Sequence, residues 1–179
     1  MRPTNSSALL RLVPHLCLLL LSAACGGAPK DGASTLTPEE TARIEAEVRE
    51  VEDRFNGAYA RNDMETYWTF YDDDLTQWMD SGRLSLERYR RDWTAMLEAG
   101  GAVLEARMED LQVMVSPAGD AAVASYRLIV RLRDGQGKET SGTYHESDTW
   151  FRRDGQWKVV HLHYSAAGGG QTPAPGGAP

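Results

Sequence analysis

The carboxyl groups of Glu146 and Asp148 are the side chains best placed in this sequence to bind a ligand or to transfer a proton. Together with Tyr144 and Trp150 they occupy every second position of the segment 139–152, so all four share one face of a predicted strand. A carboxyl group that faces an apolar interior has a raised pKa and can act as a general acid or base near neutral pH. In the alternative arrangement both acids lie at the mouth of a pocket, where arginine or water neutralises them.

Three histidines form a second group with chemical potential. His161 and His163 are two residues apart and therefore share a strand face, and His145, on the neighbouring strand, alternates away from Asp148 toward the same side. Neutral imidazoles so arranged can bind a metal ion. We assign His145, His161 and His163 to a dimer interface on the outer face of the sheet, with core packing and catalysis as alternatives, and we expect no metal.

Aromatic side chains are numerous enough to line a pocket. Tyrosine hydroxyls at its mouth would orient a polar ligand, whereas in the alternative interpretation the same rings form the core. The expected lining consists of Trp68, Tyr71, Trp78, Tyr126, Tyr144, Trp150 and Tyr164. The sequence contains no glycine-rich phosphate loop, no serine–histidine–aspartate arrangement and no nucleophilic cysteine, so we expect no cofactor. Asp72–Asp74 is interpreted as the end of a helix rather than as a calcium site.

Three predicted helices precede the strands. The first begins at Thr37, where Thr37, Pro38 and Glu40 form a capping box, and its apolar residues recur every three or four positions from Ile44 to Tyr59. The second, shorter helix begins at Asn62, and a short strand follows at 75–79. The third helix is capped by Ser85 and ends at Gly100 and Gly101.

The pattern then changes to a period of two. Strands are expected at 102–115, 121–133, 139–152 and 156–165, separated by turns rich in Gly, Asp and Pro. Helices followed by an antiparallel meander indicate an α+β fold. We expect a cone-shaped, strongly curved, mostly antiparallel sheet with three helices on its concave face and a small-molecule pocket at the mouth of the cone.

The final hairpin carries a family resemblance. Its residues Trp150 to Trp157 (WFRRDGQW), followed by Val159-Val160-His161-Leu162-His163, resemble the last two strands of SnoaL-like proteins in the nuclear-transport-factor-two-like superfamily. They resemble equally the association domain of calcium/calmodulin-dependent protein kinase II. The resemblance covers 39–165 and implies the cone fold. It leaves the function open, because members include isomerases, dehydratases, cyclases and oligomerising hubs.

Two departures from these relatives concern the pocket. The kinase association domain holds a small carboxylate with arginines, but the matching positions here are Leu128, Asp148 and Tyr164, so carboxylate binding of that type is not expected. The resemblance to the ketosteroid isomerase branch places Asp80 and Tyr59 at two of that branch's catalytic positions. Asp80 therefore joins Asp148 and Glu146 as a candidate catalytic residue.

The N-terminus resembles an export signal. Arg2 and Arg11 precede the apolar run Leu16–Leu21, and the segment 21–27 (LSAACGG) resembles a lipobox with Cys25 as the acylated residue. An ordinary secretory signal cleaved near Ala24 is the alternative. We expect a signal peptide at 1–24, a lipidated tether at 25–36, the cone domain at 37–165 and a disordered Gly/Pro/Ala tail at 166–179.

The net charge and the predicted export signal together limit the partners that we expect. The net charge of the chain is −7, and without residues 1–24 it carries 17 basic and 26 acidic residues, which argues against nucleic acid. Contact with a membrane is expected only through the lipid, at the outer membrane rather than the inner. We expect a lipid-anchored, extracytoplasmic, homodimeric domain that binds a small molecule or has an accessory role. The alternatives are a cofactor-independent isomerase, dehydratase or cyclase, and an oligomerising structural module.

Overall fold

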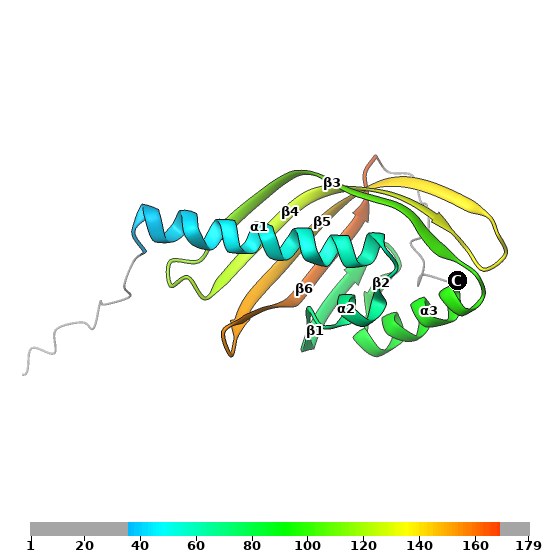
Figure 1. Cartoon of the computed structure of the whole chain (residues 1–179), viewed down its shortest axis with the longest axis horizontal. Helices are drawn as coiled ribbons and strands as arrows, with labels where there is room; N and C mark the ends of the chain where they lie inside the picture. The colour runs from blue at the N-terminus through cyan, green and yellow to red at the C-terminus, as the bar shows by residue number, and fades with distance from the viewer. Residues whose placement is uncertain (1–35, 169–179) are drawn as a thin grey trace, which may run out of the picture. The chain divides into compact units, whose positions relative to one another are not determined.

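The protein is described by a computed structural model over residues 36–168, so the expectations for residues 1–35, Cys25 included, and for residues 169–179 lie outside the described part. The elements follow one another as α1 (Pro38–Ala60), α2 (Met64–Trp68), β1 (Tyr71–Met79), β2 (Gly82–Leu84), α3 (Leu86–Glu98), β3 (Ala102–Val115), β4 (Ala121–Arg133), β5 (Glu139–Arg153) and β6 (Gln156–Ala166) (Figure 1).

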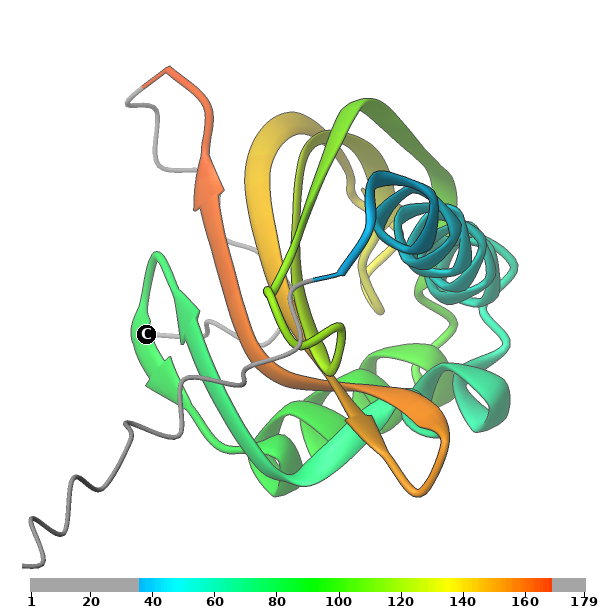
Figure 2. The ribbon, with the colours of Figure 1, turned by 90° about the vertical axis from the view of Figure 1, so that its left-hand side faces the viewer.

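The six strands form one curved sheet in the order β2-β1-β6-β5-β4-β3. All neighbouring strands are antiparallel except β1 and β6, which are parallel. The sheet bends around α1, which crosses its concave side, while α2 and α3 lie toward the end near β1 (Figure 2). This is the expected α+β architecture, and the fold-class prediction is confirmed.

Local signals placed most element boundaries correctly. The Thr37 hydroxyl accepts the backbone N–H of Glu40, and the Glu40 carboxylate accepts the backbone N–H of Thr37 at 2.8 Å, which completes the predicted capping box. Ser85 caps α3 by accepting the backbone N–H of Arg88. The four long strands match their predicted ranges to within one residue at each end.

The region between α1 and α3 differs from the expectation. Asp63, rather than Asn62, caps α2, because Asn62 adopts a φ of 58° and pairs its side-chain amide with the backbone of Val103. Asp72–Asp74 lies inside β1 and does not end a helix. A short strand, β2, forms a hairpin with β1 where only a turn was expected.

Strand β3, at one border of the sheet, is not regular along its whole length. Its pairing register with β4 shifts between Glu109 and Gln112, and Asp110 in the shift has a φ of 56°. The guanidinium of Arg127 on β4 contacts the carboxylates of Glu109 and Asp110 across this bulge at 3.0 and 2.6 Å. The bulge bends the strand and interrupts its ladder.

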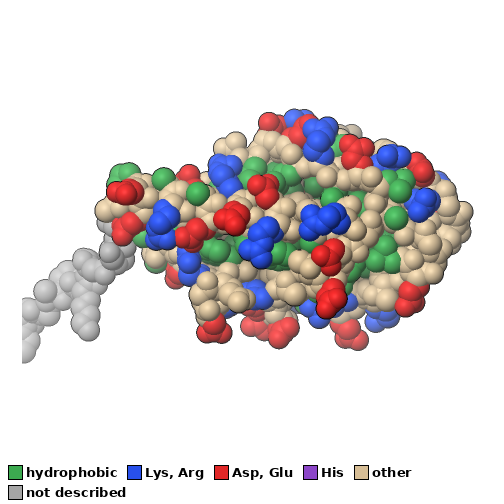
Figure 3. Space-filling model, in the orientation of Figure 1, with side chains coloured by type: hydrophobic (Ala, Val, Ile, Leu, Met, Phe, Trp, Pro, Cys, Tyr) green, Lys and Arg blue, Asp and Glu red, His purple; other side chains and the backbone are tan. Residues whose placement is uncertain are grey.

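The core lies between the concave face and the helices. It contains the apolar stripe of α1, including Ile44, Val48 and Phe55, and the inward residues of the long strands. Solvent-facing charges of both signs are interspersed over the face that α1 crosses (Figure 3). Within residues 36–168 the structure has no helix that combines the length and apolar character needed for a membrane span.

Candidate functional site

Three carboxyl groups are buried together between α1 and β5. Glu146 and Asp148 are 5% and 0% exposed on the concave face of β5, and Glu52 of α1 is 0% exposed. Alternation along β5 places both of its acids on one face, as the sequence predicts, and the structure shows that this face is the buried one. Glu52 faces them because it lies four residues after Val48 on the buried side of α1.

Neutral donors hold two of these acids. The Tyr126 hydroxyl donates to Asp148 Oδ2 at 2.8 Å, and Asn56 Nδ2 lies 3.1 Å from the Tyr126 oxygen and 3.2 Å from Glu52 Oε2. The Trp150 indole N–H donates to Glu52 Oε1 at 2.5 Å. The network links α1, β4 and β5 without contributing a positive charge.

The burial of these acids changes their protonation. Burial raises the pKa of Asp148 to about 7, although hydrogen bonds from Tyr126 and Glu52 oppose the shift. Burial and the nearby Asp148 charge raise the pKa values of Glu52 and Glu146 well above their usual range. None of the ion pairs between described residues involves any of the three acids. The cluster therefore retains protons at neutral pH, because ionised carboxylates packed this closely repel one another.

A small cavity adjoins Glu146. It is lined by Asn56, Tyr59, Tyr67, Met79, Tyr89, Trp93, Leu128, Glu146, Leu162 and Tyr164, and its volume is about 20 Å³. A space of that size holds about one or two water molecules. A ligand of more than a few atoms would therefore require the surrounding rings to move.

Tyrosines form a layer on the helical side of this cavity. The Tyr71 hydroxyl donates to the Tyr67 oxygen at 2.6 Å, and the Tyr67 and Tyr89 oxygens are 3.4 Å apart. Phe55 stacks on Tyr67 with a centroid separation of 4.7 Å. Burial raises the pKa of Tyr89 to about 12, so this hydroxyl stays neutral and can donate a hydrogen bond at physiological pH.

The aromatic residues predicted as pocket lining occupy several different places. Tyr164 lines the cavity and stacks on Tyr144 with ring centroids 4.3 Å apart. Tyr126 and Trp150 are not part of the lining and donate hydrogen bonds to Asp148 and Glu52. The placement of Trp78 corrects the prediction, because alternation along β1 turns it to the convex face, where it is 49% exposed.

The two aromatic residues near α2 belong to the tyrosine layer. Trp68 packs edge-to-face on Tyr89 at 5.4 Å, and the Arg90 guanidinium lies over the Trp68 ring. Tyr71 is 5% exposed and acts through its hydrogen bond to Tyr67. Neither Trp68 nor Tyr71 lines the cavity.

Asp80 lies apart from the other two predicted catalytic acids. It is exposed in the turn between β1 and β2, where its carboxylate accepts the backbone N–H of Ala166 at 3.1 Å. Asp80 is not among the residues that line the cavity beside Glu146, and no hydrogen bond between described residues links it to the buried cluster. The structure therefore does not bring Asp80 together with Glu146 and Asp148.

The three histidines lie on the convex face, as alternation predicts. His145 and His163 are exposed, and His161 is half-buried with Nδ1 2.8 Å from Thr76 Oγ1. Among residues 36–168 no group of three or more His, Cys, Asp or Glu side chains is arranged to hold a metal ion. The interface role of these histidines stays a prediction.

The sequence interpretation missed Glu52 and Asn56, because it placed the polar residues of the first helix in solvent. A signal was nevertheless present. Ile44, Val48, Glu52 and Asn56 follow one another at intervals of four, so the two polar residues continue the line of buried apolar ones. A glutamate on the line of apolar residues could have been recognised as a partner for the acids of β5.

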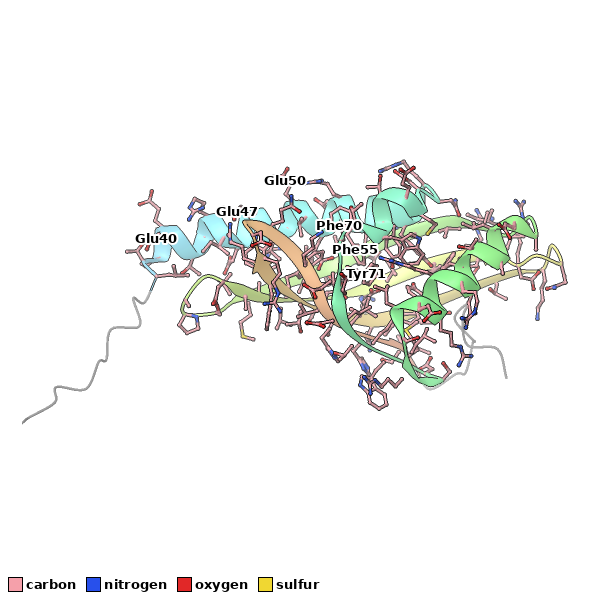
Figure 4. All side chains as sticks on the ribbon, turned by 90° about the horizontal axis from the view of Figure 1, so that it is seen from below. Glu40, Glu47, Glu50, Phe55, Phe70 and Tyr71 are labelled. Carbon is pink, nitrogen blue, oxygen red and sulfur yellow. The ribbon has the colours of Figure 1, made fainter. Side chains whose placement is uncertain are left out.

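A second hollow, of about 630 Å³, is lined by residues of α1, of the connection between α2 and β1, and of the hairpin of β5 and β6. Figure 4 labels Glu47, Glu50 and Phe70 along it. Several of its polar groups are already paired: Arg152 contacts Glu47 at 2.6 Å, and Lys158 donates to the carbonyl of Thr69. We interpret this hollow as a structural junction rather than as the site.

Comparison with known families is consistent with this geometry. The family model described as the calcium/calmodulin-dependent protein kinase II association domain matches residues 44–168. The chain belongs to this family. The matched segment includes α1 from Ile44 onward, all six strands and every residue of the acid cluster.

Solved structures support the association-domain fold. A protein of the nuclear-transport-factor-two-like class from Rhodospirillum rubrum is 20% identical, with a TM-score of 0.60 over 67% of this chain and 98% of its own. The association domain of the C. elegans kinase is 21% identical, with a TM-score of 0.54 over 73% and 100%. The hub homology domain from Chlamydomonas reinhardtii is 22% identical, with a TM-score of 0.56 over 69% and 97%. The resemblance to the nuclear-transport-factor-two-like superfamily is thereby confirmed.

Proposed function

We propose that this association domain binds a small molecule in the cavity beside Glu146. The observation that carries the proposal is the Glu146 carboxyl itself, which is 5% exposed, lines the cavity and has no ion-pair partner among the described residues. A buried carboxyl group without a basic partner costs free energy whenever it ionises. Groups of this kind, with perturbed pKa values in a concave site, mark functional sites more often than structural ones.

The surroundings of Glu146 also support binding. Three buried acids without a basic partner destabilise the folded domain, whereas apolar residues in their place would pack without that cost. Trp93, which also lines the cavity, has an indole N–H that is buried and has no partner among the described residues. The cavity therefore presents a carboxyl group without a basic partner and one free donor.

Native mass spectrometry of the full chain, purified in mild detergent, tests this proposal. We expect a co-purified small molecule, or capture of one from a metabolite mixture. Glu146→Gln should lose that ligand, whereas Glu139→Gln, at the exposed end of the same strand, should retain it. A chain that neither retains nor captures any small molecule would contradict the proposal.

A second candidate function is self-association through the convex face. Trp78 is 49% exposed there and lies opposite His163 in the register of β1 and β6. Exposed tryptophan beside histidine suits the centre of an interface, since aromatic residues are enriched there. The relatives named association and hub domains also favour this candidate.

Light scattering tests the second candidate. We expect the full chain to have at least the mass of a dimer and Trp78→Arg to lower it. Ala42→Arg adds the same charge to an exposed position on α1 and should leave the mass unchanged. A wild-type mass equal to one chain would exclude self-association under the conditions tested.

A further inference from the structure

We propose that the ligand is a small organic cation, a protonated amine of a few heavy atoms whose ammonium group binds the Glu146 carboxylate. This inference rests on the proposed function, because it names the chemical class that the same cavity would take. Four features of the site support it, namely the incomplete hydrogen bonding of Glu146, the sign of the charge, the aromatic walls and the volume.

The first feature is the hydrogen-bonding state of Glu146. Tyr126 lies opposite Glu146 in the register of β4 and β5 and is its hydrogen-bonding neighbour, but its single hydroxyl proton is donated to Asp148 Oδ2. It therefore cannot satisfy both acids at the same time. A ligand must supply the donor, and an ammonium group carries several.

The second feature is the sign of the charge. Glu146 is the only ionisable acid or base among the lining residues apart from the tyrosines, and the lining contains no lysine, arginine or histidine. Glu52 and Asp148 are close enough to interact electrostatically with Glu146, and they add to its negative potential whenever they ionise. An anionic ligand would be disfavoured, whereas a bound cation would stabilise the ionised form of Glu146, for which the described residues supply no basic partner.

The third feature is the chemistry of the walls. Five of the ten lining residues are aromatic: Tyr59, Tyr67, Tyr89, Trp93 and Tyr164. The faces of such rings attract cations, and the attraction strengthens where water is excluded. Burial raises the pKa values of the four tyrosines, so their rings stay neutral and do not compete as bases.

The fourth feature is size. The cavity volume of about 20 Å³ excludes a steroid or a polyketide unless the core rearranges, but it suits a group of a few heavy atoms. A three-atom ligand binds at best with a dissociation constant on the order of 1 mM, since affinity per atom is limited. The measurement must therefore work at millimolar ligand concentrations.

The experiment uses nuclear magnetic resonance of the full chain, with the indole N–H of Trp93 as the reporter. Trp93→Phe identifies that signal by its loss. Ethylammonium, ethanol and acetate are added separately, because they are close in size and differ in charge. We expect ethylammonium to shift the Trp93 signal with a millimolar dissociation constant, and ethanol and acetate to bind at least tenfold more weakly.

Two variants assign the effect to the carboxylate. Glu146→Gln should weaken ethylammonium binding at least tenfold, and Glu139→Gln should leave it unchanged. If Glu146→Gln fails to fold, the wild-type comparison of the three probes still decides the outcome.

Three results would overturn the inference. Acetate or ethanol binding as tightly as ethylammonium would show that the site does not select cations. Failure of all three probes, with a neutral or anionic molecule retained in native mass spectrometry, would refute the amine class and leave the proposed function standing. Failure of all three with no retained molecule would refute both.

Discussion

Replacing Asp148 by asparagine should make the stability of the domain less dependent on pH. In the folded chain burial raises the pKa of Asp148 from its usual value of 3.8 to about 7. The folded state therefore binds this proton more tightly than the unfolded state. The resulting stabilisation is complete below the unfolded pKa and is lost as the pH rises through the folded pKa.

The magnitude follows from the size of the shift. About three pKa units at 1.36 kcal/mol each correspond to roughly 4 kcal/mol between low pH and pH 8. About two of these three units of stabilisation are lost between pH 5 and pH 7, where the folded state still holds the proton and the unfolded state does not. Asp148→Asn should therefore gain about 3 kcal/mol on the wild type between pH 5 and pH 8, because the amide does not titrate there. For a domain of this size the gain equals roughly 10 °C in Tm.

Thermal unfolding followed by circular dichroism at both pH values measures this difference. The amide oxygen of asparagine can still accept the Tyr126 hydroxyl, so the variant should fold. Asp73→Asn, at an exposed position of β1, is the matched control and should follow the wild type at both pH values. If the Asp148→Asn and wild-type curves run parallel from pH 5 to pH 8, then Asp148 does not titrate in this range and the reasoning is wrong.

Three further predictions follow from contacts and motifs described above. Trp150→Phe removes the donor to buried Glu52 and should lower the free energy of unfolding in urea by about 1–3 kcal/mol; an unchanged midpoint would show that the hydrogen bond is unimportant. Ser85→Ala removes the cap of α3 and should cost about 1 kcal/mol in the same assay, whereas a loss below a few tenths would mean that another group caps the helix. Cys25→Ser should abolish incorporation of labelled fatty acid and release the protein from the membrane fraction, and continued labelling would refute the lipoprotein prediction.

The long strands could be predicted because their side chains have a simple environment. In β4 every second residue from Ala122 to Leu132 is buried, and the intervening arginines face out, so the sequence itself shows the alternation. Turn residues then fixed the ends. The signals that begin α1 and α3 and the glycines that end α3 are equally local, which explains why these boundaries were predicted accurately.

The parts that failed depend on distant contacts. Three consecutive aspartates disfavour a strand, yet Asp72–Asp74 lies in β1 because Tyr71 before it and Thr76 after it pair in parallel with β6, about 85 positions later in the chain, and the register shifts between those two residues. Similarly, the position of Glu52 becomes meaningful only when α1 is laid across β5. The shared face of Glu146 and Asp148 was predictable from alternation, and the family resemblance implied that this face is turned inward, but the proximity of the two acids to Glu52 was not predictable.

The bulge in β3 has a consequence for how copies of this chain can meet. A strand of 14 residues at the border of a sheet offers unpaired backbone groups to any other extended segment, and continued addition of strands would give fibres. The break between Glu109 and Gln112 and the charged side chains around it make this border a poor template. The opposite border is formed by β2, which is only three residues long. Open-ended polymerisation through the borders of the sheet is therefore disfavoured on both sides. Assemblies of defined size can still form through the faces of the sheet.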